Sequence, residues 1–176
     1  MHAHKSNTES IHPDLLDAQK FAYEPSGLLC KEITKEAESE EYGAFTFEAN
    51  DKQIKFRVAK ITPTKIGQFV TLWKRNGNGP ILPYDMADPI DLFVISVRNA
   101  QHFGQFVFPK EVLCAKGVTS KEHRGGKRAM RVYPSWDITD NKQAKQTQAW
   151  QLMYFFEIHM DGRIVDTATI KKLFSS

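Results

Sequence analysis

Residues 56–75 read F-R-V-A-K-I-T-P-T-K-I-G-Q-F-V-T-L-W-K-R. Apolar and polar residues alternate up to Ile61, Thr62-Pro63 breaks the pattern, and residues 67–73 resume it, which predicts two strands joined by a turn. The stretch holds no acid, and no Asp or Glu occurs between Asp51 and Asp85. Five cations lie in it: Arg57, Lys60, Lys65, Lys74 and Arg75. This asymmetry predicts a positive field on one strand pair.

The bulk composition indicates a single soluble domain. The chain has 176 residues, a net charge of +3 and a pI of about 8.8, so a nucleic-acid interpretation depends on clustering of charge rather than on its total. Cys30 and Cys114 have no C-x-x-C spacing and are interpreted as small buried residues in a reducing compartment, the cytoplasm. No apolar run reaches membrane-spanning length, and no secretory signal is seen. Residues 1–10 are predicted as a loose tail, and residues 11–176 as one domain.

Strand and helix patterns follow each other along the rest of the chain. Residues 45–49 and 53–61 alternate around Asn50-Asp51-Lys52 and predict a β-hairpin. Further strands are predicted at 90–97, which is apolar enough to be buried on both faces, and at 104–108 and 129–133. Helices are predicted at 11–24, 110–116, about 140–159 and 165–174, whereas residues 28–33 fit either state. The expected fold is α+β, with a mixed central β-sheet of about five to six strands flanked by helices.

Five blocks of the chain carry a resemblance to a known family. They are 57–75, quoted above except for its first residue, then D-L-F-V-I (91–95), G-Q-F-V-F-P-K (104–110), G-G-K-R-A-M-R-V-Y-P-S-W-D (125–137) and Q-A-W-Q (148–151). In this order and spacing they resemble the MepB family, over about residues 42–156. The resemblance implies a bacterial, cytoplasmic protein with a restriction-endonuclease-like fold of the PD-(D/E)XK type. It also implies nucleic-acid binding, which has been suggested for that family.

The catalytic pattern of that fold is degenerate in this chain. Metal-dependent nucleases of this type place an acid two residues before a lysine, and the acids hold a divalent metal that activates water. Lys60 takes the place of that lysine, but Val58 stands where the acid should be, and Glu48 is the one acid on the preceding strand. We therefore expect a non-catalytic site without a cofactor. The alternative is a nuclease with a migrated acid (Glu40, Glu41, Asp85, Asp88 or Asp91) that binds Mg²⁺.

The other basic residues lie in two places. Arg124, Lys127, Arg128 and Arg131 form a second cluster, and Lys142 lies at the start of the predicted helix at about 140–159. Cations and the amides of a helix start suit phosphate oxygens. Trp136 follows a strand and is a candidate for stacking on a base, whereas Trp150 is interpreted as core. If about six contacts neutralise phosphates, log K should fall with log salt at a slope of about −5. The predicted nucleic-acid-binding residues are Arg57, Lys60, Lys65, Lys74, Arg75, Arg124, Lys127, Arg128, Arg131, Trp136, Lys142 and Gln146.

The predicted function is thus nucleic-acid binding, with DNA favoured over RNA and no membrane partner. A protein-interaction or anion-binding module, in which the basic surface meets an acidic partner, remains open as a further alternative. The oligomeric state is left open.

Overall fold

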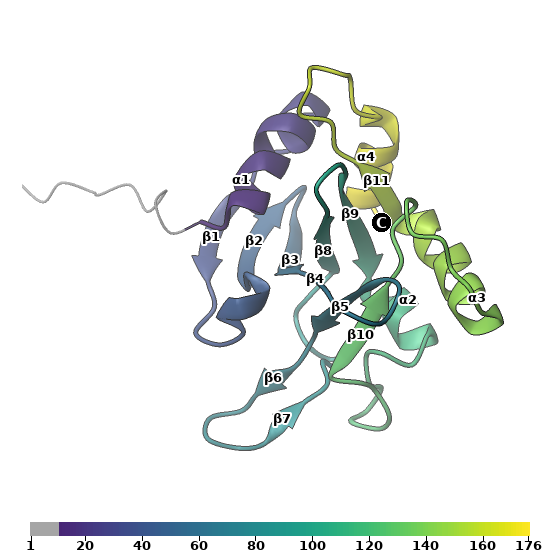
Figure 1. Cartoon of the computed structure of the whole chain (residues 1–176). Helices are drawn as coiled ribbons and strands as arrows, with labels where there is room; N and C mark the ends of the chain where they lie inside the picture. The colour runs from purple at the N-terminus through teal and green to yellow at the C-terminus, as the bar shows by residue number, and fades with distance from the viewer. Residues whose placement is uncertain (1–10) are drawn as a thin grey trace, which may run out of the picture.

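One mixed β-sheet forms the centre of the molecule in the computed structural model, which describes residues 11–176 (Figure 1). Its strands lie in the order β1-β2-β3-β8-β9-β11, and β3 and β8 are parallel while all other neighbours are antiparallel. The six strands are β1 (Lys31–Lys35), β2 (Phe45–Ala49), β3 (Lys52–Val58), β8 (Leu92–Arg98), β9 (Phe103–Pro109) and β11 (Phe155–Glu157). The α+β prediction is confirmed. The predicted tail lies outside the described residues.

The β2–β3 hairpin forms where the alternation and the turn predicted it. Asn50 and Asp51 both have positive φ, 52° and 59°, as a two-residue turn that matches the twist of its strands requires. The resulting register places Phe45 opposite Phe56 and Phe47 opposite Ile54, so the apolar residues of both strands share one face. Residues 28–33, which fit either state by sequence, contain the first three residues of the edge strand β1, which begins at Lys31.

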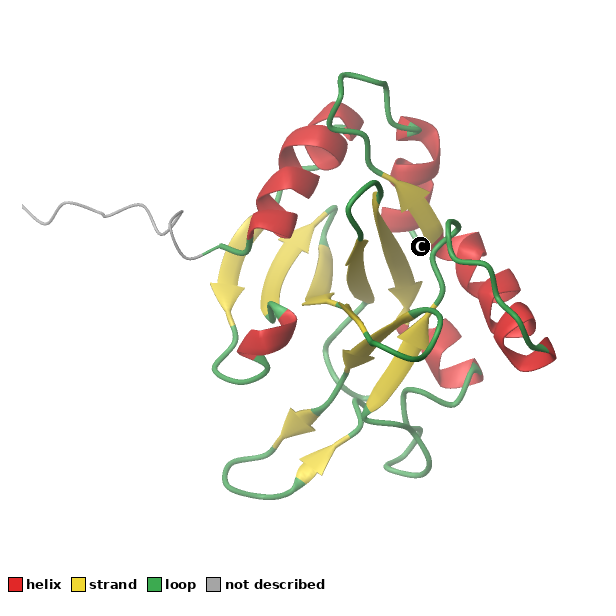
Figure 2. Cartoon of the chain, viewed as in Figure 1, coloured by secondary structure: helices red, strands yellow, loops and turns green. Residues whose placement is uncertain are grey.

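The central sheet separates two hydrophobic cores. Figure 2 shows the helices and the smaller sheet arranged around it. One face of β3 and β8, with Phe56 and Val94, packs against the first helical segment and the last helix. The other face, with Phe93 and Ile95, packs against a smaller sheet and against Leu113 and Trp150 of two later helical segments. Strand β8 is buried on both faces, as its continuous apolar run predicted.

The smaller sheet takes two strands from the crossover between β3 and β8 and one strand from later in the chain. Its order is β10-β5-β4, from β4 (Lys60–Ile61), β5 (Gln68–Thr71) and β10 (Ala129–Val132), and β6 (Lys74–Arg75) pairs with β7 (Ile81–Leu82) in a separate hairpin. The single strand predicted over 53–61 is therefore wrong beyond Val58. The amide of Ala59 makes the last bond to β8, with the oxygen of Ser96 at 2.9 Å, and the chain then leaves the central sheet.

Helical segments cover both faces of the sheet. α1 (Pro13–Ala18) continues through η2 (Gln19–Tyr23) and η3 (Glu24–Ser26), and η4 (Glu40–Tyr42) precedes β2. The other helices are α2 (Lys110–Ala115), α3 (Lys142–Gln151), which continues into η5 (Leu152–Tyr154), and α4 (Thr167–Phe174). Among the helices of residues 11–176, none combines the length and apolar character that crossing a bilayer demands.

The helix predicted over about 140–159 is too long. α3 ends at Gln151, and Phe155 adopts extended geometry (φ −122°, ψ 145°) and pairs with Phe106 of β9. Met153, which follows α3, is 72% exposed, while Ala144 and Gln151 of α3 are buried. Gln151 bonds the backbone of β10 and of Tyr133 beside it, so α3 is fixed to the smaller sheet by a buried amide rather than by an apolar face.

Candidate nucleic-acid interface

A groove of about 630 Å³ lies between the smaller sheet and α3. Four cations from separate segments line it: Lys65 of the β4–β5 loop, Lys116 after α2, Lys127 before β10, and Arg131 on β10. Asp140 is the one acid in the lining. The sequence predicted three of these four cations as contacts, and the fold brings them to one concave surface, called here the basic groove.

The groove cations are held without counter-charges. Arg131 donates to Thr62 Oγ1 at 3.0 Å and to the oxygen of Gly67 at 3.2 Å, which fixes its guanidinium beside the loop. Lys116 Nζ lies 5.2 Å from the centre of the Trp150 ring. Within residues 11–176, none of the four forms an ion pair. Their positive charge is therefore available to a ligand.

The first turn of α3 adds backbone donors to the same groove. Asn141 is the N-cap, and its side chain accepts from the amide of Ala144 at 2.8 Å. Asn141, Gln143 and Ala144 line the groove, so the positive end of the helix dipole faces it. Lys142 and Gln146 are exposed on α3 but are not part of the lining.

Arg57 is buried instead of facing a ligand. Alternation along β3 turns it to the second core, where it is 1% exposed. It forms an ion pair with Glu36 and donates to the Tyr84 hydroxyl at 3.0 Å, while Lys55 bonds the other oxygen of Glu36 at 2.7 Å. A buried guanidinium requires such a partner. The guanidinium of Arg57 therefore lies inside the protein and is not part of a ligand-binding surface.

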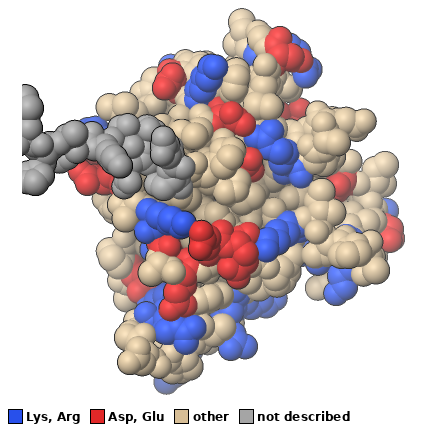
Figure 3. Space-filling model, turned by 60° about the vertical axis from the view of Figure 1, so that its left-hand side comes forward, with Lys and Arg blue, Asp and Glu red and all other residues tan. Residues whose placement is uncertain are grey.

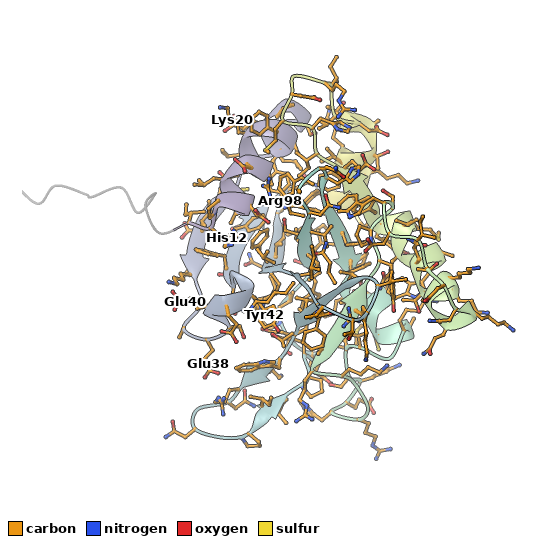
Figure 4. All side chains as sticks on the ribbon, in the orientation of Figure 1. His12, Lys20, Glu38, Glu40, Tyr42 and Arg98 are labelled. Carbon is orange, nitrogen blue, oxygen red and sulfur yellow. The ribbon has the colours of Figure 1, made fainter. Side chains whose placement is uncertain are left out.

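Lys74 and Arg75 are also neutralised, on the β6–β7 hairpin. Lys74 pairs with Asp88 at 2.6 Å, and Arg75 pairs with Glu38 at 3.0 Å and donates to the oxygen of Gly79. Figure 4 shows Glu38 next to this hairpin. On the side of the molecule that carries β1, acidic and basic side chains lie next to each other (Figure 3). The acid-free stretch of sequence is thus not an acid-free surface.

Lys60, in the place of the nuclease lysine, stands on β4 outside the central sheet. Its Nζ lies 4.5 Å from the centre of the Tyr42 ring, and Tyr42 is labelled in Figure 4. Three of the acids considered as migrated ligands have other partners: Glu40 pairs with Lys35, Asp88 with Lys74, and Asp91 accepts from the amide of Gln53. Across residues 11–176, no three His, Cys, Asp or Glu side chains gather as a metal site needs.

Arg124 and Arg128 are exposed in and after a loop that Asp85 holds in place. The buried Asp85 carboxylate accepts from Ser120 Oγ at 2.7 Å and from the amides of Ala87 and His123, both at 2.9 Å. These bonds, the one from Ser120 above all, hold the pKa of Asp85 below its ordinary value. The loop is thus anchored close to the basic groove, although neither arginine lines it.

Trp136 is half-buried rather than free. The His102 ring stacks on it at 5.0 Å between centroids with an interplanar angle of 11°, and Phe155 meets it edge to face. It packs against the second core but also lines a small cleft beside the basic groove. Trp150 packs against Phe108 and the same core, as its interpretation as a core residue required.

A model of the MepB-like family matches residues 36–157. The chain belongs to the MepB-like family. A crystal structure of MepB is 36% identical, with a TM-score of 0.72 over 85% of this chain and 97% of that chain. The bacterial homing endonuclease I-Ssp6803I is 14% identical, with a TM-score of 0.45 over 85% of this chain and 93% of that chain, a level of similarity that by itself defines neither fold nor function. No curated protein matches the chain.

Two residues of this MepB-like chain that make contacts in the structure were not predicted from the sequence. Lys116 lines the basic groove but stands alone in the sequence just before Gly117, whose φ of 75° ends the α2 segment. Glu36, which is not among the predicted site residues, pairs with Arg57 and Lys55. A signal for Glu36 did exist: a strand cation that becomes buried needs an acid, and residues 36–41 hold the nearest acids before the hairpin.

Proposed function

We propose that this MepB-like protein binds nucleic acid, with phosphates of the backbone lying in the basic groove. The observation that carries the proposal is the convergence of Lys65, Lys116, Lys127 and Arg131 on one groove with a single acid. Lysine and arginine supply most contacts to phosphate, and such contacts position a nucleic acid without reading its sequence. The family membership and the predicted restriction-endonuclease-like fold point in the same direction.

The chemistry of the groove suits an anionic backbone better than a neutral ligand. The first turn of α3 offers amides next to the cations, an arrangement that favours phosphate oxygens. Four neutralised phosphates on duplex DNA correspond to a salt slope of about −3.6, which is shallower than the slope of about −5 expected from six contacts. We propose DNA over RNA as the partner, and a non-catalytic role.

Fluorescence anisotropy of labelled 20-base-pair DNA tests the proposal. The wild type should bind at about 50 mM salt, and Lys65→Ala/Lys127→Ala should weaken binding about tenfold or more and flatten the slope by about 1.8 units. Both lysines are exposed and outside any ion pair of the described residues, so folding should be unaffected. The same measurement with RNA of equal length decides between the two polymers.

Lys20→Ala/Lys31→Ala is the matched control. It removes the same charge from exposed lysines, one on η2 (labelled in Figure 4) and one on β1, at the opposite edge of the sheet from β11. Its salt slope should equal that of the wild type. Equal losses of DNA affinity in both double variants would mean that net charge alone drives the association, which would refute the basic groove as the binding site. A wild type that binds neither polymer would refute the function.

The two alternatives have their own readouts. Cleavage of plasmid DNA by the wild type in Mg²⁺ or Mn²⁺, absent from the Lys60→Ala variant, would establish the nuclease with a migrated acid. An acidic protein captured under nuclease treatment, and released by Lys65→Ala/Lys127→Ala, would establish the protein-interaction module. Either result would replace the non-catalytic nucleic-acid role.

The proposed location is the bacterial cytoplasm. Cys30 and Cys114 are both free thiols, as they are in a reducing compartment. Burial raises the pKa of Cys30 to about 12, with a smaller contribution from Glu24, so this thiol is not poised for redox chemistry.

A further inference from the structure

A second hollow, of about 190 Å³, lies on the other side of the β4–β5 loop from the basic groove. The two hollows share Lys65 and Ile66, so the loop tip forms the wall between them. The lining of the second hollow, called here the apolar cleft, consists of residues 61, 65–68, 99 and 136–138. A hollow of this size is smaller than sites for whole small-molecule ligands and fits one flat group.

Exposed apolar side chains surround the apolar cleft. Ile138 is 86% exposed, Ile61 is 63% exposed and Ile66 is 36% exposed, and all three line it together with Trp136. Single exposed isoleucines are ordinary, but a group of three around a tryptophan marks a contact surface. His102 and Phe155 fix the Trp136 ring from two sides, so the indole is preorganised.

Two amide side chains in the lining have unused hydrogen-bonding capacity. Gln68 is 2% exposed and its Nε2 donates to the oxygen of Arg98 at 3.3 Å, but its buried Oε1 has no partner within the described residues. Asn99 uses Oδ1 to accept from the amides of Gln101 and His102, and its Nδ2 makes no bond to residues 11–176. Amide side chains of this kind read the edges of bases.

The charge of the apolar cleft differs from that of the basic groove. The Asp137 carboxylate lines the cleft, and Lys65 at the shared wall is its one cation. Burial raises the pKa of Asp137, against the bond from the Gly67 amide. A carboxylate repels phosphate but accepts hydrogen bonds from the N–H groups of bases, whether an exocyclic amine or the ring N3–H of thymine. The cleft therefore fits a base and not another phosphate.

We propose that the apolar cleft binds an unpaired nucleobase whose neighbouring phosphates lie in the basic groove. The inference rests on the proposed function and narrows its partner to single-stranded or locally unpaired nucleic acid. Bases in a duplex are stacked and paired, so they cannot enter a cleft on the protein surface without leaving the helix. Stacking of one base on an aromatic side chain is worth about 1–3 kcal/mol, or roughly fivefold to 150-fold in affinity.

Three labelled oligonucleotides of equal length test it: dT12, an abasic 12-mer and a 12-base-pair duplex. The wild type should bind dT12 at least fivefold more tightly than the abasic strand, which keeps the phosphates and lacks the bases. Ile61→Asn/Ile138→Asn should lower dT12 affinity to the abasic level and leave the salt slope unchanged. Lys65→Ala/Lys127→Ala should flatten the slope for both strands. Trp136 fluorescence should change with dT12 and not with the abasic strand, when read in a Trp73→Phe/Trp150→Phe background.

Leu29→Asn/Ile164→Asn is the control for lost exposed apolar area, since these side chains are 67% and 89% exposed and lie outside the cleft. It should bind dT12 like the wild type. Equal affinity of the wild type for dT12 and the abasic strand would overturn the base site while leaving phosphate binding in place. If Ile61→Asn/Ile138→Asn binds dT12 like the wild type but the protein sediments at a different rate, the apolar cleft is a contact between proteins, and the base site is again overturned. No binding to any strand would refute the proposed function itself.

Discussion

The cations of the β3 and β6 strands and the cations of the basic groove differ in what lies opposite them. Arg57, Lys74 and Arg75 each face a carboxylate, although their stretch of sequence holds no acid. Lys65, Lys127 and Arg131 form no ion pair among the described residues, although Asp140 lines the same groove. A charge pattern along the chain thus does not predict the surface field, because folding brings acids from other segments onto one group of cations and not onto the other.

The largest effect is expected where an acid neutralises a buried cation. Glu36→Gln would leave Arg57 and Lys55 without their counter-charge, and removal of one member of such a pair costs about 3 kcal/mol or more. Urea denaturation should show this loss. Glu38→Gln, whose partner Arg75 is partly exposed, should cost less than about 1 kcal/mol. Equal losses in the two variants would erase the distinction between buried and surface neutralisation.

Gly67→Ala tests the groove side, because Gly67 ends the loop that carries Lys65. Its φ is +83°, and an added Cβ would lie 2.8 Å from the oxygen of Val132 and 2.7 Å from the Tyr133 ring. We expect a loss of about 2–3 kcal/mol in unfolding free energy, together with weaker DNA binding. Gly77→Ala, with φ +59° and nothing within 4 Å, should cost about 1 kcal/mol and leave binding unchanged.

Acid should weaken the anchor of the loop that carries Arg124. The folded pKa of Asp85 lies below its ordinary value of 3.8, so its contribution is present above about pH 4 and is lost as the pH falls below that value. Thermal unfolding between about pH 3 and 6 should show a fall in Tm that is smaller in Asp85→Asn, which starts lower at pH 6. Parallel profiles for the two proteins would exclude Asp85 as a source of acid sensitivity.

The smallest effect is expected from Arg75→Met. Because Glu38 already neutralises Arg75, its loss should change DNA affinity less than about twofold and stability by less than about 1 kcal/mol. Lys127→Met in the basic groove should change affinity several-fold and flatten the salt slope by about 0.9 units. Anisotropy titrations of both variants provide the measurement, and a larger effect from Arg75 would move the binding surface to the β6–β7 hairpin.

The sequence predicts those elements whose structure is decided locally. Alternation and the Asn50-Asp51 turn specify the β2–β3 hairpin, and a continuous apolar run specifies β8. Residues 152–156 show the limit, because their apolar spacing fits a helix while Phe155 and Phe156 also suit a strand. Pairing with β9 decides for the strand, and no local pattern reveals that pairing.

The candidate site was predictable only in part, for the same physical reason. Lys65, Lys127 and Arg131 could be predicted as groove residues because each is a cation in a turn or on a short strand near other cations. Arg57 was misplaced because its strand lies in the middle of the sheet, where both faces are covered. Lys116 was missed because the groove it lines forms only when α2, β10 and α3 meet.

The parallel pairing of β3 with β8 also bears on how the molecule assembles. The β2–β3 and β8–β9 hairpins close short loops. Pairing β3 with β8 closes a longer loop, residues 59–91, and the smaller sheet is complete only when β10, at residues 129–132, pairs with β5. Contacts between segments so distant in the chain form slowly, because the entropy of closing the loop is lost before the pairing compensates it. The hairpins should therefore acquire protection from hydrogen exchange early in refolding, and the walls of the basic groove should be among the last parts to become ordered.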